Sequence, residues 1–577
     1  MRGEHDPVHE ARGASAFCRA LREEEWHALP TKIPRVSRLR RTGQRCFSRR
    51  LVLRGAVASL SAAGSRIAGA PAARAQSATP VPGNASIPRS RIVAAIERLD
   101  ELTRDALART PVPGLAMAVV HDDEVVDTRG YGVREAAGAD PVDADTIFPL
   151  ASMSKPITST IVAALVSEKL VDWDDRVADL NPGFEMYDPW VTREVRVRDF
   201  LSHRSGLPEG AGDVLVDLGI ERDELMRRVR YIIPDSSFRS QYAYCNVGYT
   251  AGAIAAAMPT GLSWEDAAET FLYAPAGMTS TSSRFADLVA APNHAVEHVK
   301  RDGEWVHLME GNDDAESPAG GVSSNVVDLA RWMRLQLGLG QLDGERLISA
   351  AALGETRRPR IVSSPHPDPN SLTGFYGLGW DIGVTPQALL QISHSGAFNL
   401  GAATTVYLIP DAQIGIVMLT NAYPIGLVEG LAASFIDLAL TGTLTQDWMR
   451  IFLNAFAALV QQAASEASSY DYASPPAAPA PAWPAETYLG RYANDLYGEI
   501  EIVEAVDGLA IVAGPNRTTY PLLHFDGDVF SYEPVGENAF GVSGVIFTVG
   551  PGRQASAVLV DQFNAHGQGT FARSAGS

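Results

Sequence analysis

The stretch Pro149-Leu-Ala-Ser-Met-Ser-Lys-Pro156, with the apolar segment after it, most constrains what this chain can fold into. Apolar residues recur after it at the spacing of one helix face, at Ile157, Ile161, Ala164 and Leu165. This spacing predicts an amphipathic helix. A proline is tolerated only in the first turn of a helix, so Pro156 marks the helix start. Ser152 and Lys155 then meet on one face at that start, because residues three apart are neighbours.

A hydroxyl beside an amine can act as a nucleophile with its base. A serine hydroxyl is a poor nucleophile until a base removes its proton. Lysine is a base only when neutral, and its ordinary pKa of about 10.4 must be lowered by burial or nearby positive charge. Arginine cannot take this role. Ser-x-x-Lys is a short motif, so a solvated lysine at position 155 is the alternative.

The use of basic residues makes Lys155 informative. Lysine occurs only at positions 32, 155, 169 and 300, and every other basic residue except histidine is arginine. A chain that uses arginine almost everywhere has a titratable amine where the predicted chemistry needs one.

Length, charge and cysteine content narrow the class of protein. The 577 residues are enough for two to four domains. Residues 1–75 carry a net charge of +9 and the remainder −29. A strongly acidic body argues against nucleic-acid binding. Cys245 is the only cysteine beyond residue 75, so no intrachain disulfide is expected in the body. No Cys/His cluster has metal-ligand spacing, so we predict no metal and no cofactor.

Residues 1–75 contain the parts of an export signal in their usual order. Ser48-Arg-Arg-Leu-Val-Leu-Arg54 resembles the twin-arginine signature, an Ala-rich run follows, and Ala73-Arg-Ala75 ends in small residues. We predict cleavage after Ala75 and a periplasmic or extracellular location. The uncharged run is shorter than the roughly 18 residues that span a bilayer, so we expect no stable membrane span in the mature chain. Residues 76–88 are predicted to be a flexible spacer.

The main domain is predicted over residues 89–445. Its patterns indicate a helix over Ser90–Ala108, two strands over Gly114–Val120 and Glu124–Gly132, a helical middle, and two late strands over Thr404–Leu408 and Ile414–Leu419. Such an order is typical of an α+β fold, a sheet flanked by helices.

Two further motifs follow Ser152 and Lys155 in the chain. Tyr244-Cys-Asn246 offers a phenol and an amide that could share a proton and orient a substrate, although each residue alone is more typical of a core or a turn. His394-Ser-Gly396 is predicted on an edge strand, where the glycine would let a substrate backbone approach. His203, at the end of a short helix, is predicted to be structural rather than a catalytic base.

Ser-x-x-Lys, Tyr-x-Asn and His-x-Gly in this order resemble the penicillin-recognising serine hydrolases, in particular the class C β-lactamase branch with its DD-peptidases, D-aminopeptidases and esterases. The similarity covers about residues 90–440 and implies a β-lactamase/transpeptidase-like antiparallel sheet flanked by helices, with an all-helical subdomain. It implies that Ser152 forms an acyl-enzyme, with Lys155 and Tyr244 exchanging protons. Asn246, His394 and Gly396 would bind substrate, and the backbone N–H groups of Ser152 and Ala397 would form the oxyanion hole.

His394 departs from the lysine that most β-lactamases have in the third motif. A histidine is charged only part of the time near neutral pH, so it is a weaker partner for a substrate carboxylate. This favours a peptidase, amidase or esterase acting on a small-molecule or peptide substrate. A β-lactamase and a non-catalytic binding protein on the same scaffold are the alternatives, and the oligomeric state is left open.

The remaining residues predict a helix, a linker and a small β domain. Trp448–Ala464 has a helical pattern, and residues 446–485 end in a Pro/Ala-rich linker. Short strands with turn signals at Asp507-Gly508 and Asp526-Gly527 predict a sandwich or barrel over residues 486–577. This part resembles the lipocalin-like module attached to some hydrolases of the family. It could be a packing domain, shape the mouth of the active site, or mediate oligomerisation.

Overall fold

A computed structural model describes residues 87–365, 373–467, 471–539 and 541–574. The predicted export signal, its cleavage site and most of the spacer lie outside these residues. No helix within the described ranges combines the length and the apolar character that crossing a membrane requires.

An eight-stranded antiparallel sheet forms the centre of the main domain. In sheet order its strands are β2 (Glu124–Gly132), β1 (Gly114–His121), β14 (Ile414–Thr420), β13 (Ala402–Ile409), β12 (Leu390–Phe398), β11 (Asp381–Val384), β10 (Gly374–Tyr376) and β9 (Ile361–Ser364). The four strands predicted from the sequence are confirmed, with ends that differ by no more than two residues.

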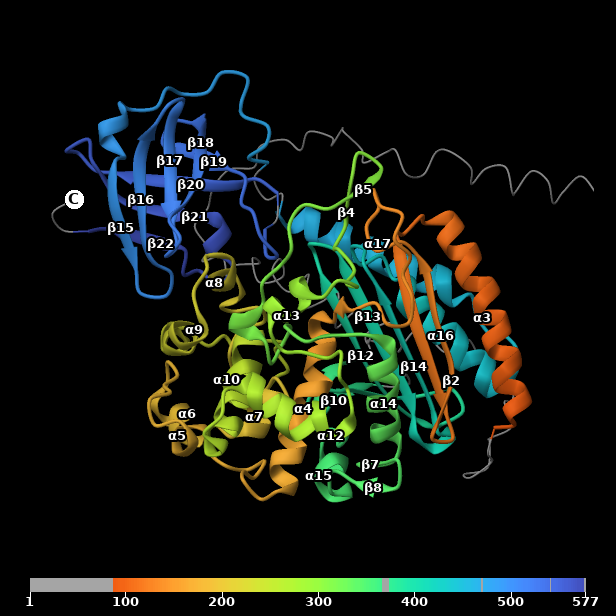
Figure 1. Ribbon diagram of the computed structural model, residues 1–577. Coiled ribbons are helices and arrows are strands. Elements are labelled where there is room, and N and C mark those ends of the chain that lie inside the picture. Colours follow the sequence, from red (N-terminus) through yellow and green to blue (C-terminus); the bar gives the residue numbers. More distant parts are fainter. Residues whose placement is uncertain (1–86, 366–372, 468–470, 540, 575–577) are drawn as a thin grey trace, which may run out of the picture. The chain divides into compact units, whose positions relative to one another are not determined.

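Helices cover both faces of this sheet (Figure 1). Strand β1 is buried along its whole length because its alternate side chains pack in two cores. Leu115, Met117 and Val119 pack with helices α3 (Arg89–Arg109) and α16 (Leu427–Thr441). Ala116, Ala118 and Val120 face the other core, which contains α14 (Val326–Leu337). The α+β prediction is confirmed.

A helical region and three small strand pairs complete the main domain. Its other helices are α4 (Ser154–Ser167), α5 (Val177–Leu180), α6 (Pro189–Glu194), α7 (Val197–Leu201), α8 (Asp213–Asp217), α9 (Arg222–Arg228), α10 (Asn246–Ala257), α11 (Trp264–Ala268), α12 (Ala274–Ala276), α13 (Phe285–Ala290) and α15 (Ala350–Glu355). The pairs are β3 (Phe148–Pro149) with β6 (Ser323–Ser324), β4 (Val299–Arg301) with β5 (Glu304–Val306), and β7 (Gln341–Leu342) with β8 (Glu345–Arg346). Helix α17 (Trp448–Ala467) then packs on α16 and confirms the helix predicted there.

Two sequence predictions about the main domain are wrong. Helix α4 is not amphipathic, because every residue from Ser154 to Leu165 is buried. Strand β12, which carries His394 and Gly396, is not an edge strand, because β11 pairs with its outer side. The short strands β9 to β11 extend the sheet beyond it, and their sequences gave no strand signal.

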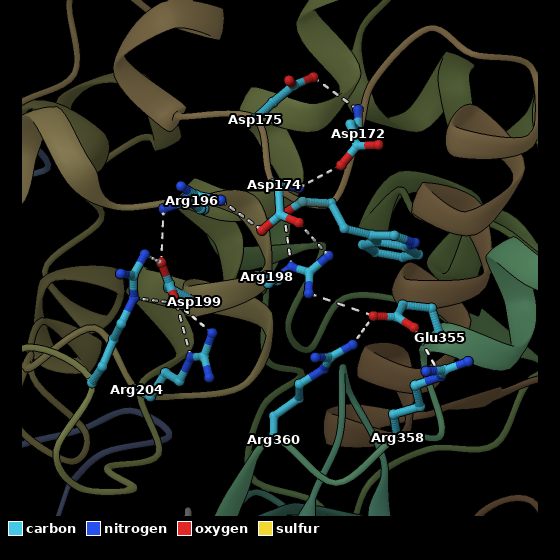
Figure 2. Close-up of polar contacts among 12 residues, drawn as sticks. Asp172, Asp174, Asp175, Arg196, Arg198, Asp199, Arg204, Glu355, Arg358 and Arg360 are labelled. Atoms are coloured by element: carbon cyan, nitrogen blue, oxygen red, sulfur yellow. Dashed lines mark hydrogen bonds and ion pairs between the residues drawn. The ribbon is translucent and has the colours of Figure 1, made fainter.

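An ion-pair network holds the helical region together (Figure 2). Asp199 of α7 is fully buried, and its carboxylate accepts hydrogen bonds from Arg204 Nε at 2.8 Å and from Arg239 Nη2 at 2.6 Å. Glu355 bridges Arg198 and Arg360 nearby. Burial of Asp199 is tolerated because its charge is paired and its oxygens are hydrogen-bonded.

The C-terminal strands close into an antiparallel barrel. They are β15 (Gly490–Asn494), β16 (Gly498–Ala505), β17 (Gly508–Ala513), β18 (Thr518–Asp526), β19 (Val529–Tyr532), β20 (Ser543–Val549), β21 (Ala555–Val560) and β22 (Thr570–Arg573). Aromatic side chains pack inside it, with the rings of Tyr488 and Phe547 4.7 Å apart. Closure removes the exposed edges that an open sheet of this length would present.

Candidate active site

A strained turn presents Ser152 at the start of helix α4. Ser152 lies in the 3₁₀ turn η1 (Ala151–Met153), and Ala151 before it has a φ of +49°, which a residue with a side chain rarely adopts. Thr404 Oγ1 of β13 donates to Leu150 O at 2.7 Å and ties this turn to the sheet. Strain of this kind persists only where the surrounding structure holds it in place.

Lys155 is the polar centre of the site. Its side chain is fully buried, and Nζ lies 3.0 Å from Ser152 Oγ, 2.7 Å from Asn246 Oδ1 and 3.0 Å from Ala319 O. Burial lowers the pKa of Lys155 to about 7, although nearby Glu316 and Asp213 act to raise it. A pKa this low makes the neutral amine, which can accept the Ser152 proton, accessible near neutral pH.

The second motif surrounds Lys155. The amine lies 4.4 Å from the centre of the Tyr244 ring. Asn246 begins α10, and while its Oδ1 accepts from Lys155, its Nδ2 donates to Asp213 Oδ2 at 3.3 Å. Asn246 therefore holds the amine of Lys155 in place.

His203 has a structural role, as the sequence predicted. Its ring is buried, lies 4.3 Å from the Tyr244 ring, and accepts a hydrogen bond from Cys245 N at Nδ1, at 3.1 Å. Burial, with Lys155 and His394 nearby, holds the pKa of His203 well below its usual value. A neutral His203 thus fixes the backbone between Tyr244 and Asn246. The backbone N–H of Ala243 also donates to His203 O at 2.9 Å, which ties this segment to the same turn.

The third motif differs from its prediction in charge. His394 is buried, and its Nδ1 donates to Ser395 O at 2.7 Å, which leaves Nε2 to accept from the Tyr376 hydroxyl at 3.0 Å. Burial and the nearby Lys155 lower the pKa of His394 to about 3. The imidazole is therefore neutral throughout the physiological range, not charged part of the time.

Gly396 is needed for packing within the protein. A Cβ at this position would lie 2.2 Å from Leu150 O and 2.9 Å from Met153 N. The turn that carries Ser152 thus approaches Gly396 closely, and the approach of a substrate at this glycine stays a prediction. Ala397 follows on β12 and lines a pocket together with Ser152 and Asn246.

Four carboxylates line this pocket, and the sequence indicated none of them. They are Asp213, Asp313, Glu316 and Glu537. Burial and neighbouring carboxylates raise the pKa of Asp313 to about 7 and that of Glu316 well above its usual value. Asp313 and Glu316 precede the turn Ser317–Gly321, and Ala319 O in this turn accepts from Lys155 Nζ, so the segment lies beside the site. Glu537 comes from the barrel, and no sequence signal connects it to Ser152.

Glu537 is fixed in place by backbone contacts. Its carboxylate accepts from Asn399 N at 2.7 Å and from Leu400 N at 3.1 Å, beyond the end of β12. Its own N–H and that of Asn538 donate to the two oxygens of Asp217 in α8, at 3.0 and 2.9 Å. The loop between β19 and β20 is thereby connected to both sides of the pocket.

More than half of the chain matches a known family. Residues 99–440 match the Beta-lactamase family, and residues 474–571 match a domain of unknown function, DUF3471. The chain is 27% identical over 464 residues to the unguisins hydrolase ungD of Aspergillus violaceofuscus, covering 74% of this chain and 81% of that protein. It is 29% identical over 331 residues to penicillin-binding protein 4 of Amycolatopsis lactamdurans, covering 56% and 83%.

A solved structure supports the fold. The octameric penicillin-binding protein homologue from Pyrococcus abyssi aligns with a TM-score of 0.52 and 18% identity, over 81% of this chain and 98% of that chain. Since the family match spans more than half of the chain and covers all three motifs, this protein belongs to the β-lactamase family and is a serine hydrolase.

Proposed function

We propose that this protein is an exported serine hydrolase that forms an acyl-enzyme on Ser152 and hydrolyses a small peptide, amide or ester. The observation that carries the proposal is the 3.0 Å separation of Ser152 Oγ from a buried lysine whose pKa is lowered to about 7. A nucleophile and a base with a pKa near the working pH are what acyl transfer requires.

In the acylation step, neutral Lys155 accepts the hydroxyl proton of Ser152 as Oγ attacks the substrate carbonyl carbon. The Ser152 and Ala397 backbone N–H groups donate to the oxyanion that forms. The protonated lysine, with Tyr244 beside it, returns a proton to the leaving amine or alcohol when the carbon–heteroatom bond breaks. The product of this half-reaction is an ester between Ser152 and the acyl group.

In the deacylation step, water gives a proton to Lys155 and attacks the ester carbonyl. Collapse of the second tetrahedral intermediate returns that proton to Ser152 Oγ and releases the acid. Asn246 holds Lys155 in place through both steps, because its Oδ1 accepts from Nζ and its amide is anchored on Asp213.

A β-lactamase is the second candidate, and the third motif argues against it. A β-lactam presents a carboxylate, whereas His394 is neutral and hydrogen-bonded at both ring nitrogens. The site therefore has no fixed charge at this position to hold that carboxylate. We expect slow β-lactam turnover at most.

Labelling with a fluorophosphonate tests the proposal. This neutral probe should modify wild type, and Ser152→Ala should abolish the labelling. Ser556→Ala, an equivalent change at an exposed serine of the barrel, should label like wild type. Labelling that persists in Ser152→Ala would refute the assignment. Unlabelled wild type should also hydrolyse members of an ester and aminoacyl amide panel, and fluorophosphonate treatment should abolish that hydrolysis.

Export is supported by the order of the twin-arginine-like stretch, the Ala-rich run and Ala75. Secreted protein should begin at Gln76 by mass spectrometry, and replacing Arg49 and Arg50 together by lysine should retain the protein in the cell. A secreted product that keeps residues before Gln76 would contradict the predicted cleavage.

A further inference from the structure

We propose that the pocket beside Ser152 binds the ammonium group of the substrate, so that the enzyme prefers substrates with a free amine close to the carbonyl it attacks. This inference rests on the proposed function. It concerns the acidic side of the pocket, whose carboxylates neither take nor give a proton in the acyl-transfer steps.

The charge of the pocket favours a cation. Asp213, Asp313, Glu316 and Glu537 line it together with Ser152, and none of the described residues that line it is a lysine, arginine or histidine. The basic group in contact with Ser152 is Lys155, which the mechanism requires in its neutral form. Closely grouped carboxylates disfavour one another's ionised forms, which contributes to the raised pKa values of Asp313 and Glu316, and a bound cation would offset this effect.

Glu316 supplies a second and independent observation. Glu316 is only 5% exposed, and its Oε1 has no hydrogen-bond partner among the residues that the structure describes. A buried carboxylate oxygen without a partner is costly, and native proteins rarely leave one unsatisfied. Because Glu316 lines the pocket, an ammonium group bound there can donate to this oxygen.

Glu537 comes from the barrel and is the fourth member of an acidic wall that consists of Asp213, Asp313, Glu316 and Glu537. Its two oxygens each accept one backbone N–H, from Asn399 and Leu400. Burial raises the pKa of Glu537 well above its usual value, and a cation bound beside it would favour the ionised form, which has about four acceptor sites. Its position is fixed by these bonds and by Asp217. Glu537 can therefore receive a further donor without moving.

The shared lining of the pocket places the amine near the reacting carbon. Ser152 and the four carboxylates line the same pocket, so a ligand held by the carboxylates has its neighbouring carbonyl close to Ser152 Oγ. We therefore expect small aminoacyl substrates, with the amine on the carbon next to the carbonyl or one or two bonds further away.

Three p-nitroanilides that differ in charge test this inference. Those of alanine, lactic acid and N-succinyl-alanine present an ammonium, a neutral hydroxyl of similar size and a carboxylate. In wild type, kcat/KM should fall in this order for at least one enantiomer. The alanine compound should exceed the lactic acid compound by about 10- to 100-fold, the usual contribution of a hydrogen bond to a charged group.

Variants assign the preference to the carboxylates. Glu316→Gln and Glu537→Gln should each lower the ratio of the alanine to the lactic acid compound by about tenfold. Glu533→Gln is the matched control, because this exposed carboxylate lies in the same barrel loop and outside the pocket. It should leave the ratio unchanged. Fluorophosphonate labelling of each variant shows whether it is folded with a reactive Ser152. The test can be read from either pocket variant alone, if the other fails to fold.

Protection of Ser152 from fluorophosphonate labelling compares an ammonium ligand with a neutral one without measuring turnover. Alaninamide should slow fluorophosphonate labelling of Ser152 at lower concentrations than lactamide. Equal protection by the two amides, equal hydrolysis of the two anilides, or a preference that persists in both pocket variants would overturn the ammonium site while the hydrolase assignment stands. Absence of Ser152 labelling in wild type would instead refute the proposed function.

Discussion

The pH dependence of Ser152 acylation follows from the environment of Lys155. The perturbation is a change of pH from about 5 to about 10, a range that spans the pKa of the buried and of an ordinary lysine amine. Burial moves the Lys155 pKa from the ordinary 10.5 to about 7. Only the neutral amine can accept the Ser152 proton, so the acylation rate should follow its deprotonation.

The size of the effect can be worked from this shift. With a pKa of 10.5, about one amine in 3,000 is neutral at pH 7, whereas about half are neutral with a pKa of about 7. The reactive fraction therefore rises by about a thousandfold. The difference corresponds to on the order of 5 kcal/mol of preference for the neutral form. That preference is the balance of burial against Glu316 and Asp213, which favour the ammonium.

The assay is the second-order rate of fluorophosphonate labelling, because the probe does not titrate. The rate should rise about tenfold per pH unit below pH 7 and become constant above about pH 8. Lys155→Arg should abolish this rise and nearly all labelling, because arginine does not deprotonate. Lys169→Arg makes the same change at an exposed position and should behave like wild type. A rate that climbs only above about pH 9, or a Lys155→Arg enzyme that labels normally, would refute the reasoning.

Three further predictions concern packing and buried charge. Gly396→Ala should lower the free energy of unfolding by about 1–3 kcal/mol and slow Ser152 labelling, because its Cβ has no room, whereas Gly383→Ala on β11, where a Cβ meets nothing within 4 Å, should do neither. In urea unfolding, Asp199→Asn should cost about 3–5 kcal/mol by leaving two arginines unpaired, and Asp174→Asn, in an exposed ion pair, about 0–1 kcal/mol. Burial raises the pKa of Glu297 to about 8 from 4.5. The folded protein therefore keeps the Glu297 proton over a range in which the unfolded chain loses it, so stability is highest below about pH 4.5 and falls as the pH rises to about 8. Glu297→Gln should reduce the fall of Tm over that window, and an unchanged slope of Tm against pH would contradict this.

The sequence predicts those parts of the fold in which neighbouring residues decide the outcome. Helix α3 and strands β1, β2, β13 and β14 carry their periodicity in the chain. The edge position predicted for β12 was wrong because β9 to β11 are too short to show a pattern. The amphipathic prediction for α4 was wrong because burial on all sides depends on what packs around the helix, which periodicity in the helix does not contain.

The candidate site divides in the same way. Ser152 and Lys155 are three residues apart, so their contact follows from helix geometry alone. Sequence reasoning assigned Tyr244, Asn246 and His394 to the site because their motifs follow Ser152 and Lys155 in the order typical of the family. The neutral state of His394 could not be predicted, because it depends on Tyr376 and on burial. The acidic wall of the pocket joins α8, the segment before the Ser317–Gly321 turn and the barrel, and local reasoning has no means of bringing these together.

Two opposing electrostatic effects meet at Lys155, and their balance explains why an acidic pocket can serve a lysine base. Burial favours the neutral amine, while Glu316 and Asp213 favour the ammonium. Without the carboxylates the lysine would have a lower pKa and be a weaker base; without burial it would stay protonated. A substrate ammonium held by Glu316 would offset the effect of that carboxylate on Lys155. Recognition of the substrate and release of the base would then depend on the same charges, and the four carboxylates would serve the chemistry of the site as well as its specificity.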